Sequence, residues 1–321
     1  MEVSINQDIK ALEFDQSEND AEFIYAQMTA LEDYIVRSIV KTGTTVQSVS
    51  IPDLERLDLP VPIRSEQTRI GEFFRTLDTL IAANQRKVDL LANAKRCYYK
   101  LLFPEVGQLQ PYLRSPGFTE DWKEYAFASV FEPIRSNTLA WADMNFEHGE
   151  VMCIHYGDVL TKFGAVTNCE TETIPFISHA TIGQYANQLL RDGDIVLADA
   201  AEDETVGKAT EISDSRLKPV VSGLHTIACH PRWAFEPFYL GLYLNSPSFH
   251  SQLLPLMQGT KVLSISRNAI AATKILYPSS RREQGFVASL FQNLDKMTAA
   301  CMKTVEDLQY LKRAYLQKMF I

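Results

Sequence analysis

The sequence predicts an α+β protein built from a duplicated module, in which a mixed lobe lies between two long helices that pack on each other. Two distant segments match each other, each copy ends in an apolar heptad pattern, and short apolar runs separated by turn residues fill the region between. The 321 residues are about twice a typical domain length, and 46% of them are hydrophobic and 22% charged. These values indicate a folded chain with two lobes or one large domain.

The internal repeat joins segments that lie 216 or 217 residues apart. This period far exceeds the 20 to 50 residues of solenoid repeats, so it indicates a duplicated module with an inserted domain. The matching positions are residues 43–50 with 259–266, Pro62 with Pro278, Glu66-Gln67 with Glu283-Gln284, Leu77-Asp78 with Leu294-Asp295, Lys95-Arg96 with Lys312-Arg313, and Phe103 with Phe320.

The last 40 residues of each copy predict one long helix, over 63–103 and 279–321. Seam residues recur at alternating spacings of four and three, which is the heptad pattern of helices that pair, with Asn84, Lys95 and Lys312 as polar positions that set the register. A helix of 38 residues is about 57 Å long, too long for one lobe to bury. Two independent surface helices are the alternative. The predicted pairing residues are Leu77, Ile81, Val88, Leu91, Tyr98, Leu294, Val305, Leu308 and Tyr315.

The region between the two helices predicts a linker and then the mixed lobe. Residues 104–117 are rich in Pro and Gly, as expected of a linker, and the lobe covers 118–278. Apolar runs such as 194–198 predict strands, and 238–256 predicts a helical stretch broken at Pro247. The net charge is −9, but the acidic segments 1–62 and 104–278 alternate with basic helical segments.

Several strings in the lobe, together with the repeat, resemble the DNA-specificity subunits of type I restriction-modification systems. The strings are the Gly-Phe-Thr after Pro116, Trp122, Ile154-His155-Tyr156-Gly157-Asp158, Gly193-Asp194-Ile195-Val196, Ser222-Gly223-Leu224-His225-Thr226 and Gln258-Gly259-Thr260. In their order beside the duplicated helices, they look like one branch of that family's target-recognition domains.

The resemblance implies two recognition domains, each followed by a conserved helix, with the two helices pairing as an antiparallel coiled coil. The second recognition domain would span the 161 residues 118–278, whereas the first would retain only the remnant 1–62. An engineered fragment, a truncated or silent gene copy, and one piece of a two-piece protein are all compatible with this shape. The implied partners are double-stranded DNA, two modification (methyltransferase) subunits and restriction subunits.

Sequence-specific DNA binding needs polar side chains that reach base edges and cations that hold phosphates. Three polar clusters in the lobe fit this need, and each could instead be a turn or core feature of the fold, His225 above all. The predicted DNA-binding residues are His155, Tyr156, Asp158 and Lys162; Lys208 and His225; and Gln258, Gly259, Thr260, Lys261 and Ser264. Gly259 would let the backbone approach a phosphate closely.

The sequence favours a non-catalytic protein without cofactor or metal. It has no Asn/Asp-Pro-Pro-Tyr/Phe methyltransferase motif, no Walker loop and no paired His/Cys zinc spacing. The acidic string that ends in Glu204 and precedes Lys208 is better explained as a solvated loop than as a nuclease site. Five scattered Cys and no long apolar stretch predict a cytoplasmic protein. The competing hypothesis is a coiled-coil assembly scaffold that no longer reads DNA.

Overall fold

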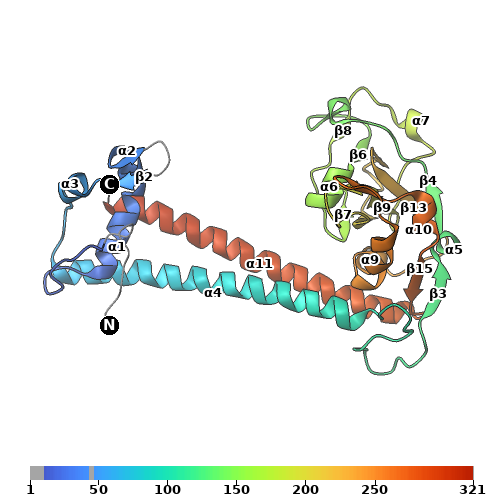
Figure 1. Ribbon diagram of the computed structural model, residues 1–321, viewed down its shortest axis with the longest axis horizontal. Helices are drawn as coiled ribbons and strands as arrows, with labels where there is room; N and C mark the ends of the chain where they lie inside the picture. Colours follow the sequence, from blue (N-terminus) through green and yellow to red (C-terminus); the bar gives the residue numbers. More distant parts are fainter. Residues whose placement is uncertain (1–10, 43–46, 321) are drawn as a thin grey trace. The chain divides into compact units, whose positions relative to one another are not determined.

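The computed structural model describes residues 11–42 and 47–320. They fall into two compact units: unit 1 contains Met1–Ala92 and Lys296–Ile321, and unit 2 contains Asn93–Asp295. The long helices α4 (Arg64–Leu102) and α11 (Arg281–Phe320) each contribute to both units (Figure 1). The prediction of an α+β fold with two long helices is therefore confirmed.

The two long helices pair in opposite directions within each unit. In unit 1 the Phe73 ring of α4 lies 5.1 Å from the Tyr315 ring of α11. In unit 2 the Tyr99 ring of α4 lies 4.5 Å from the Phe291 ring of α11. Because the start of each helix meets the end of the other, the pair is antiparallel, as the resemblance implied.

The seam residues face the partner helix for most of its length. Leu77, Leu294 and Val305 are buried. Five other predicted pairing residues are half-buried: Ile81, Val88, Leu91, Tyr98 and Leu308. Near the end of α11, Tyr315 is 37% exposed while Leu316 is only 7% exposed. Tyr315 still contacts α4 through the Phe73 ring, so both residues belong to the paired face at this end.

Two ion pairs at the seam repeat the duplication in three dimensions. The Lys95 ammonium donates to the Asp295 carboxylate at 2.5 Å, and the Lys312 ammonium donates to the Asp78 carboxylate at 2.5 Å. Adding 217 to the numbers of the Lys95 and Asp78 positions gives Lys312 and Asp295. The same ion pair thus joins the two helices once in each unit, and the lysines fix the register.

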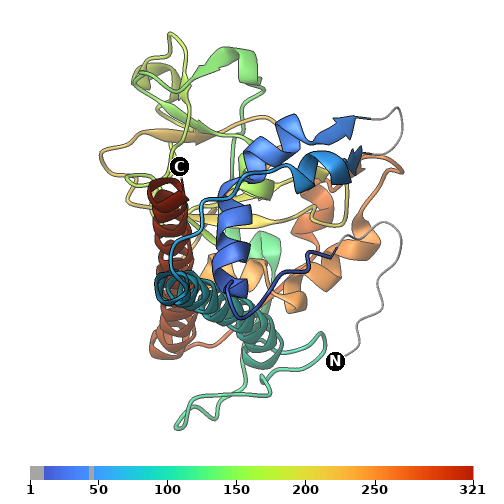
Figure 2. The same ribbon diagram turned by 90° about the vertical axis from the view of Figure 1, so that its left-hand side faces the viewer.

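Unit 1 consists of short elements packed on the ends of the long helices (Figure 2). They are α1 (Ala21–Ala30), α2 (Glu32–Ser38), the antiparallel strands β1 (Val40–Thr42) and β2 (Gln47–Val49), and α3 (Ile51–Glu55). The Phe320 ring packs against Phe23 of α1 at 5.3 Å and Phe74 of α4 at 5.9 Å. The first copy of the Gly-Thr segment, residues 43–46, lies outside the described residues.

Unit 2 contains the same elements at an offset of 216 residues. They are α8 (Tyr239–Leu244), α9 (Pro247–Leu253), the short strand β14 (Leu263–Ser264) and α10 (Arg267–Ala271), with the 3-10 turn η2 (Leu254–Leu256) after α9. The predicted helical stretch broken at Pro247 is therefore confirmed. Phe103, the counterpart of Phe320, lies 6.2 Å from both Tyr239 and Phe291, which are the counterparts of Phe23 and Phe74.

The strands of unit 2 form two main sheets. The five-stranded sheet runs β4 (Phe131–Ile134), β13 (Thr226–Pro231), β9 (Ile195–Ala198), β11 (Ala209–Ser213), β7 (Val166–Asn168). The four-stranded sheet runs β12 (Val220–Ser222), β6 (Met152–Ile154), β8 (Phe176–Ile177), β5 (Met144–Asn145). Only the pairs β11 with β7 and β12 with β6 are parallel within these sheets.

Smaller elements complete unit 2. Two further antiparallel pairs join β10 (Ala200–Ala201) to β14 and β3 (Lys123–Ala126) to β15 (Lys274–Tyr277). The remaining short helices are α5 (Phe127–Val130), η1 (Trp141–Asp143), α6 (Tyr156–Thr161) and α7 (Ile182–Tyr185).

One glycine shows how closely the inserted lobe packs on the repeated module. Gly241 in α8 lies so near the backbone that a Cβ there would be 1.9 Å from the Ala165 carbonyl oxygen. The counterpart of Gly241 in α1 is Tyr25, which is 59% exposed. In unit 2 the sheet covers this helix face, whereas no described residue covers the Tyr25 side chain to a similar extent.

Candidate nucleic-acid interface

The candidate interface begins at the carboxyl ends of two neighbouring parallel strands. Ile154 of β6 is in register with Ser222 of β12, so the residues that follow each strand meet at one edge of the sheet. His155 follows β6, and His225 follows β12 after a short turn. His155 caps α6, because its Nδ1 accepts a hydrogen bond from the Gly157 backbone N–H at 3.3 Å.

Four rings lie in a row at this edge. The ring centroids are 4.8 Å apart for Trp141 and His155, 4.6 Å for His155 and Tyr156, and 5.3 Å for Tyr156 and His225. His155 is 4% exposed, whereas Trp141 is 46% exposed. We call Trp141, His155, Tyr156 and His225 the ring cluster. It offers exposed apolar faces and hydrogen-bonding edges, which are both needed to contact bases.

Asp199 connects the ring cluster to Ile265, the residue that directly follows the segment 258–264. The His225 Nδ1 atom lies 3.2 Å from the Asp199 Oδ1 atom, and the Asp199 N–H donates to the His225 carbonyl oxygen at 3.0 Å. The Asp199 carbonyl oxygen accepts in turn from the Ile265 N–H at 2.9 Å. His225 has a φ of 52°, a left-handed conformation that is uncommon without glycine.

Residues 258–264 form a narrow exposed hairpin. Gln258 and Ser264 exchange backbone hydrogen bonds of 2.9 and 2.8 Å. Gly259 has a φ of 116°, and a Cβ there would lie 2.0 Å from the Val262 carbonyl oxygen, so only glycine fits this turn. The predicted residues of this segment, Gln258, Gly259, Thr260, Lys261 and Ser264, are all exposed.

Burial shifts the pKa values of His155 and Asp158 at this edge of the sheet. Burial lowers the pKa of His155, and the nearby His225 lowers it further, so both effects favour the neutral imidazole. Burial raises the pKa of Asp158, an effect that Lys162 opposes. Asp158 is 8% exposed, and its Oδ2 atom has no hydrogen-bond partner among the described residues.

The other predicted cations do not join the ring cluster. Lys162 donates to the Thr173 carbonyl oxygen and lies over the Phe163 ring at 5.3 Å. Lys208 donates to the Leu160 carbonyl oxygen at 2.8 Å, and burial lowers its pKa. Both amines therefore satisfy carbonyl groups of their own lobe.

Sequence reasoning missed Arg267, which lies beyond the hairpin at the start of α10. Its guanidinium donates to the Ile134 carbonyl oxygen at 3.1 Å and to the Ser136 hydroxyl at 2.7 Å. The available signal was a basic residue directly after Ser264-Ile265-Ser266. The matching string of the first copy, Ser48-Val49-Ser50, is followed by Ile51.

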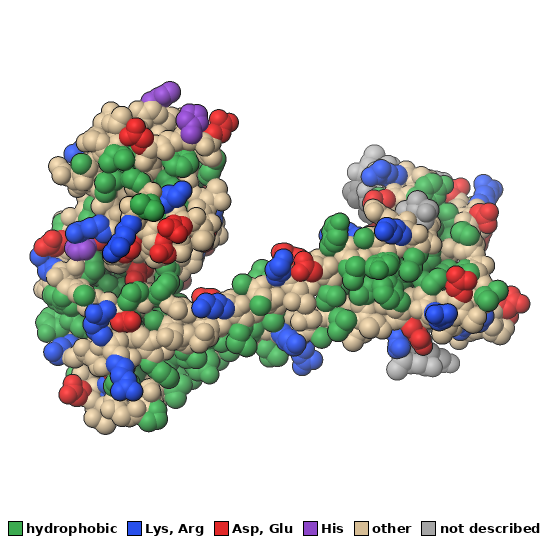
Figure 3. Space-filling view, turned by 180° about the vertical axis from the view of Figure 1, so that it is seen from behind, with side chains coloured by type: hydrophobic (Ala, Val, Ile, Leu, Met, Phe, Trp, Pro, Cys, Tyr) green, Lys and Arg blue, Asp and Glu red, His purple; other side chains and the backbone are tan. Residues whose placement is uncertain are grey.

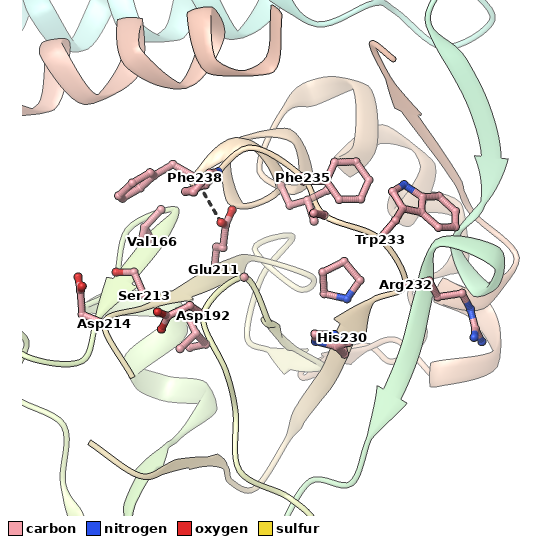
Figure 4. A pocket seen from close by; sticks show the side chains of 16 residues that line it. Val166, Asp192, Glu211, Ser213, Asp214, His230, Arg232, Trp233, Phe235 and Phe238 are labelled. Carbon is pink, nitrogen blue, oxygen red and sulfur yellow. Dashed lines mark hydrogen bonds between the residues drawn. The ribbon is translucent and has the colours of Figure 1, made fainter. Parts of the chain in front are cut away.

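A separate pocket of about 530 Å³ contains none of the predicted residues (Figure 4). Its buried Glu211 carboxylate accepts from the backbone N–H groups of Phe238 at 2.8 Å and Gly241 at 2.9 Å, and so holds the start of α8. Burial raises the pKa of Glu211 to about 7. His230 in the same pocket is bound to Asp194, so these groups hold the lobe together.

Residues 11–42 and 47–320 contain no group of three or more His, Cys, Asp or Glu arranged to hold a metal ion. No helix in the described part of the chain is long and apolar enough to cross a membrane.

Comparisons with known proteins bear on the identity of the chain. Residues 1–92 match the model of the type I restriction modification DNA specificity domain. The chain is 24% identical over 294 residues to the type I restriction enzyme MjaVIII specificity subunit of Methanocaldococcus jannaschii. The match covers 88% of this chain, which spans 65% of the length of that curated relative.

Two solved structures share the fold. A chain from a structure on complex assembly and conformational transition of the type I R-M system has a TM-score of 0.59 and 18% identity, over 95% of this chain and 72% of its own. The type I restriction-modification S subunit from M. genitalium has a TM-score of 0.57 and 16% identity, over 96% of this chain and 74% of its own.

Proposed function

We propose that the chain is a type I restriction-modification DNA specificity subunit. It would be non-catalytic and would read one half of a split DNA target through unit 2. The observation that carries this proposal is the convergence of the ring cluster and the hairpin 258–264. His155 and His225 come from distant parts of the sequence and lie in one row of rings. Asp199 contacts His225 on one side and, on the other, Ile265 at the end of the hairpin.

The chemistry of this edge suits base reading. The major groove of DNA admits a two-stranded ribbon, and its bases offer donors and acceptors that Gln and Lys side chains can match. Gln258 and Lys261 stand on the exposed hairpin, and Arg267 follows it at the start of α10. We assign base contacts to Gln258 and the ring cluster, and phosphate contacts to Lys261 and the backbone at Gly259.

The charge of the chain points to protein partners. A net charge of −9 opposes binding to DNA, whose phosphates are usually neutralised by Lys and Arg. We infer that modification (methyltransferase) subunits supply the missing positive surface. Two are expected, because the duplicated helices carry two matching sets of groups. Restriction subunits would join the same assembly, which we place in the cytoplasm.

The helix pair would set the spacer of the target. An antiparallel pair whose register is fixed by Lys95 and Lys312 has a defined length. Half-site spacing in DNA follows from protein geometry. We therefore expect a split target in which the distance between the half-sites does not vary.

The binding test uses this chain assembled with its modification subunits on a library of random duplexes. Selection should enrich one short motif. The double variant Gln258→Ala, Lys261→Ala should weaken binding to that motif by roughly 5- to 150-fold, because each good base contact contributes about 1–3 kcal/mol. Lys218→Ala is the control. Lys218 is exposed and precedes β12, whereas the ring cluster follows its other end.

Two results would contradict the proposed function. Enrichment of no common motif would favour a scaffold that does not read DNA. Unchanged affinity of the double variant for an enriched motif would remove the hairpin from the interface. Rising salt should weaken complex formation on DNA in either case, so affinity must be compared at one ionic strength.

A further inference from the structure

Unit 2 holds an extended segment of its own chain at three points. Strand β3 pairs with β15, with Tyr277 opposite Lys123. Just before β3, the Trp122 indole N–H donates to the buried Glu283 carboxylate at 3.1 Å. Just after β3, the Phe127 N–H donates to the Thr273 carbonyl oxygen at 2.8 Å. Residues 122–127 are therefore fixed by the Trp122 indole, the strand pairing of β3 and the Phe127 backbone N–H.

Unit 1 contains the matching receptor groups. The repeat places Glu66 at the position of Glu283 and residues 58–61 at the position of β15. Glu283 is 3% exposed, whereas Glu66 is exposed and no described residue donates to its carboxylate. Val61, the counterpart of the buried Tyr277, is 44% exposed. Unit 1 thus has the groups that would hold such a segment, Glu66 and residues 58–61. No described residue of the chain occupies them as residues 122–127 do in unit 2.

One side of the backbone of residues 58–61 is held by the protein, and the other side is open to pairing with a strand. Gln27 donates to the Pro60 carbonyl oxygen at 2.8 Å and so holds the inner side of this segment. The counterpart of Gln27 is Tyr243, which accepts from the Leu276 N–H of β15 at 2.9 Å. No residue within 11–42 or 47–320 forms a hydrogen bond with the backbone of Leu59 or Val61. The outer edge can therefore accept another strand.

A pocket of about 650 Å³ in unit 1 lies where the repeat places Phe127. Its lining comes from α2 and the residues beside it, from Gln27, from the end of α3 and the segment after it, and from Phe320. The lining residues are Gln27, Leu31, Tyr34, Ser38, Ile39, Asp53, Arg56, Leu57, Asp58, Pro60 and Phe320. In unit 2, α5 with Phe127 contacts α10 and β15, the counterparts of α3 and residues 58–61. The Phe127 ring is also 6.3 Å from Phe249 of α9, the counterpart of α2. Gln27 is 1% exposed and its Oε1 atom has no partner among the described residues.

We propose that unit 1 binds an extended segment of a second polypeptide that has the pattern Trp, four strand residues, then Phe. The strand pairs with the edge at Leu59 and Val61, the indole N–H donates to Glu66, and the phenyl ring enters the pocket. Added strands gain affinity from backbone hydrogen bonds and specificity from side-chain pockets. Hydrophobic side chains also gather on the face of unit 1 seen in Figure 3.

The binding test uses the full chain and a fluorescein-labelled peptide with the sequence of residues 119–131, followed by fluorescence anisotropy. We expect saturable binding that Glu66→Ala weakens about fivefold or more, because a hydrogen bond to a charged group is lost. Glu72→Ala, at an exposed position of the same helix, should bind like the unmodified chain. A peptide with Phe in place of Trp should bind less tightly to the unmodified chain and show no further loss with Glu66→Ala.

Three outcomes would overturn the proposal. The first is no saturable binding, and the second is equal binding of a scrambled peptide. The third is peptide binding that Glu66→Ala leaves unchanged. The peptide would then bind away from Glu66, for example by replacing residues 122–127 in unit 2. Sedimentation equilibrium identifies one further case: self-association abolished by Glu66→Ala would make a second copy of this chain the occupant and would contradict a separate polypeptide.

Discussion

Replacing Phe103 by alanine tests the packing of the repeated module in unit 2. Phe103 is 1% exposed. Its ring lies 5.9 to 6.3 Å from the rings of Trp122, Tyr239, Tyr243 and Phe291. Removing a buried phenyl ring from such a cluster costs about 3–5 kcal/mol, because apolar contacts are lost and a cavity remains.

The measurement is urea unfolding followed by tryptophan fluorescence. Trp122 reports directly on this cluster, since its ring is 6.3 Å from that of Phe103. Phe286→Ala on α11 is the control. Phe286 is 45% exposed, so its loss should change the free energy of unfolding by less than about 0.5 kcal/mol. A loss below about 1 kcal/mol for Phe103→Ala, or equal losses for both variants, would refute the packing described for unit 2.

Three further predictions concern single sites. Burial raises the pKa of Glu211 to about 7, so the folded state favours the neutral carboxyl group. The resulting contribution to the free energy of unfolding is fully present below pH 4.5 and is lost as the pH rises through 7. Glu211→Gln should therefore flatten the decline of the urea midpoint between pH 5 and pH 8, and an unchanged decline would contradict this. Gly241→Ala should lower the melting temperature measured by circular dichroism, because its Cβ would overlap the Ala165 carbonyl oxygen; an unaltered melting temperature would count against the close approach. Lys95→Glu should cost up to about 1 kcal/mol in urea unfolding, and adding Asp295→Lys should restore it; failure to restore would argue against this ion pair.

The helix pair could be predicted from the sequence because its information is local and repeated. A heptad pattern needs only residues three and four apart, and the duplication placed Lys95 and Lys312 at matching seam positions. The acidic partners Asp295 and Asp78 also belong to the repeat. Their pairing across the two helices follows once the helices are antiparallel.

The candidate interface was harder to predict. His155 and His225 are 70 residues apart and meet because β6 and β12 are parallel neighbours, a pairing that no local pattern encodes. The amines of Lys162 and Lys208 bind carbonyl groups of the lobe, which a charge pattern cannot reveal. Asp199 joins the ring cluster to the hairpin mainly through backbone contacts, so its side-chain type gave little signal.

Methylome sequencing tests the central claim most directly. Cells that express this chain together with its modification subunits should carry methylation at one split motif with a fixed spacer, and cells without this chain should lack it. Gln258→Ala with Lys261→Ala should abolish or alter the half-site, whereas Lys218→Ala should leave the motif intact. Methylation that is independent of this chain, or that follows no common sequence, would contradict a role in DNA specificity.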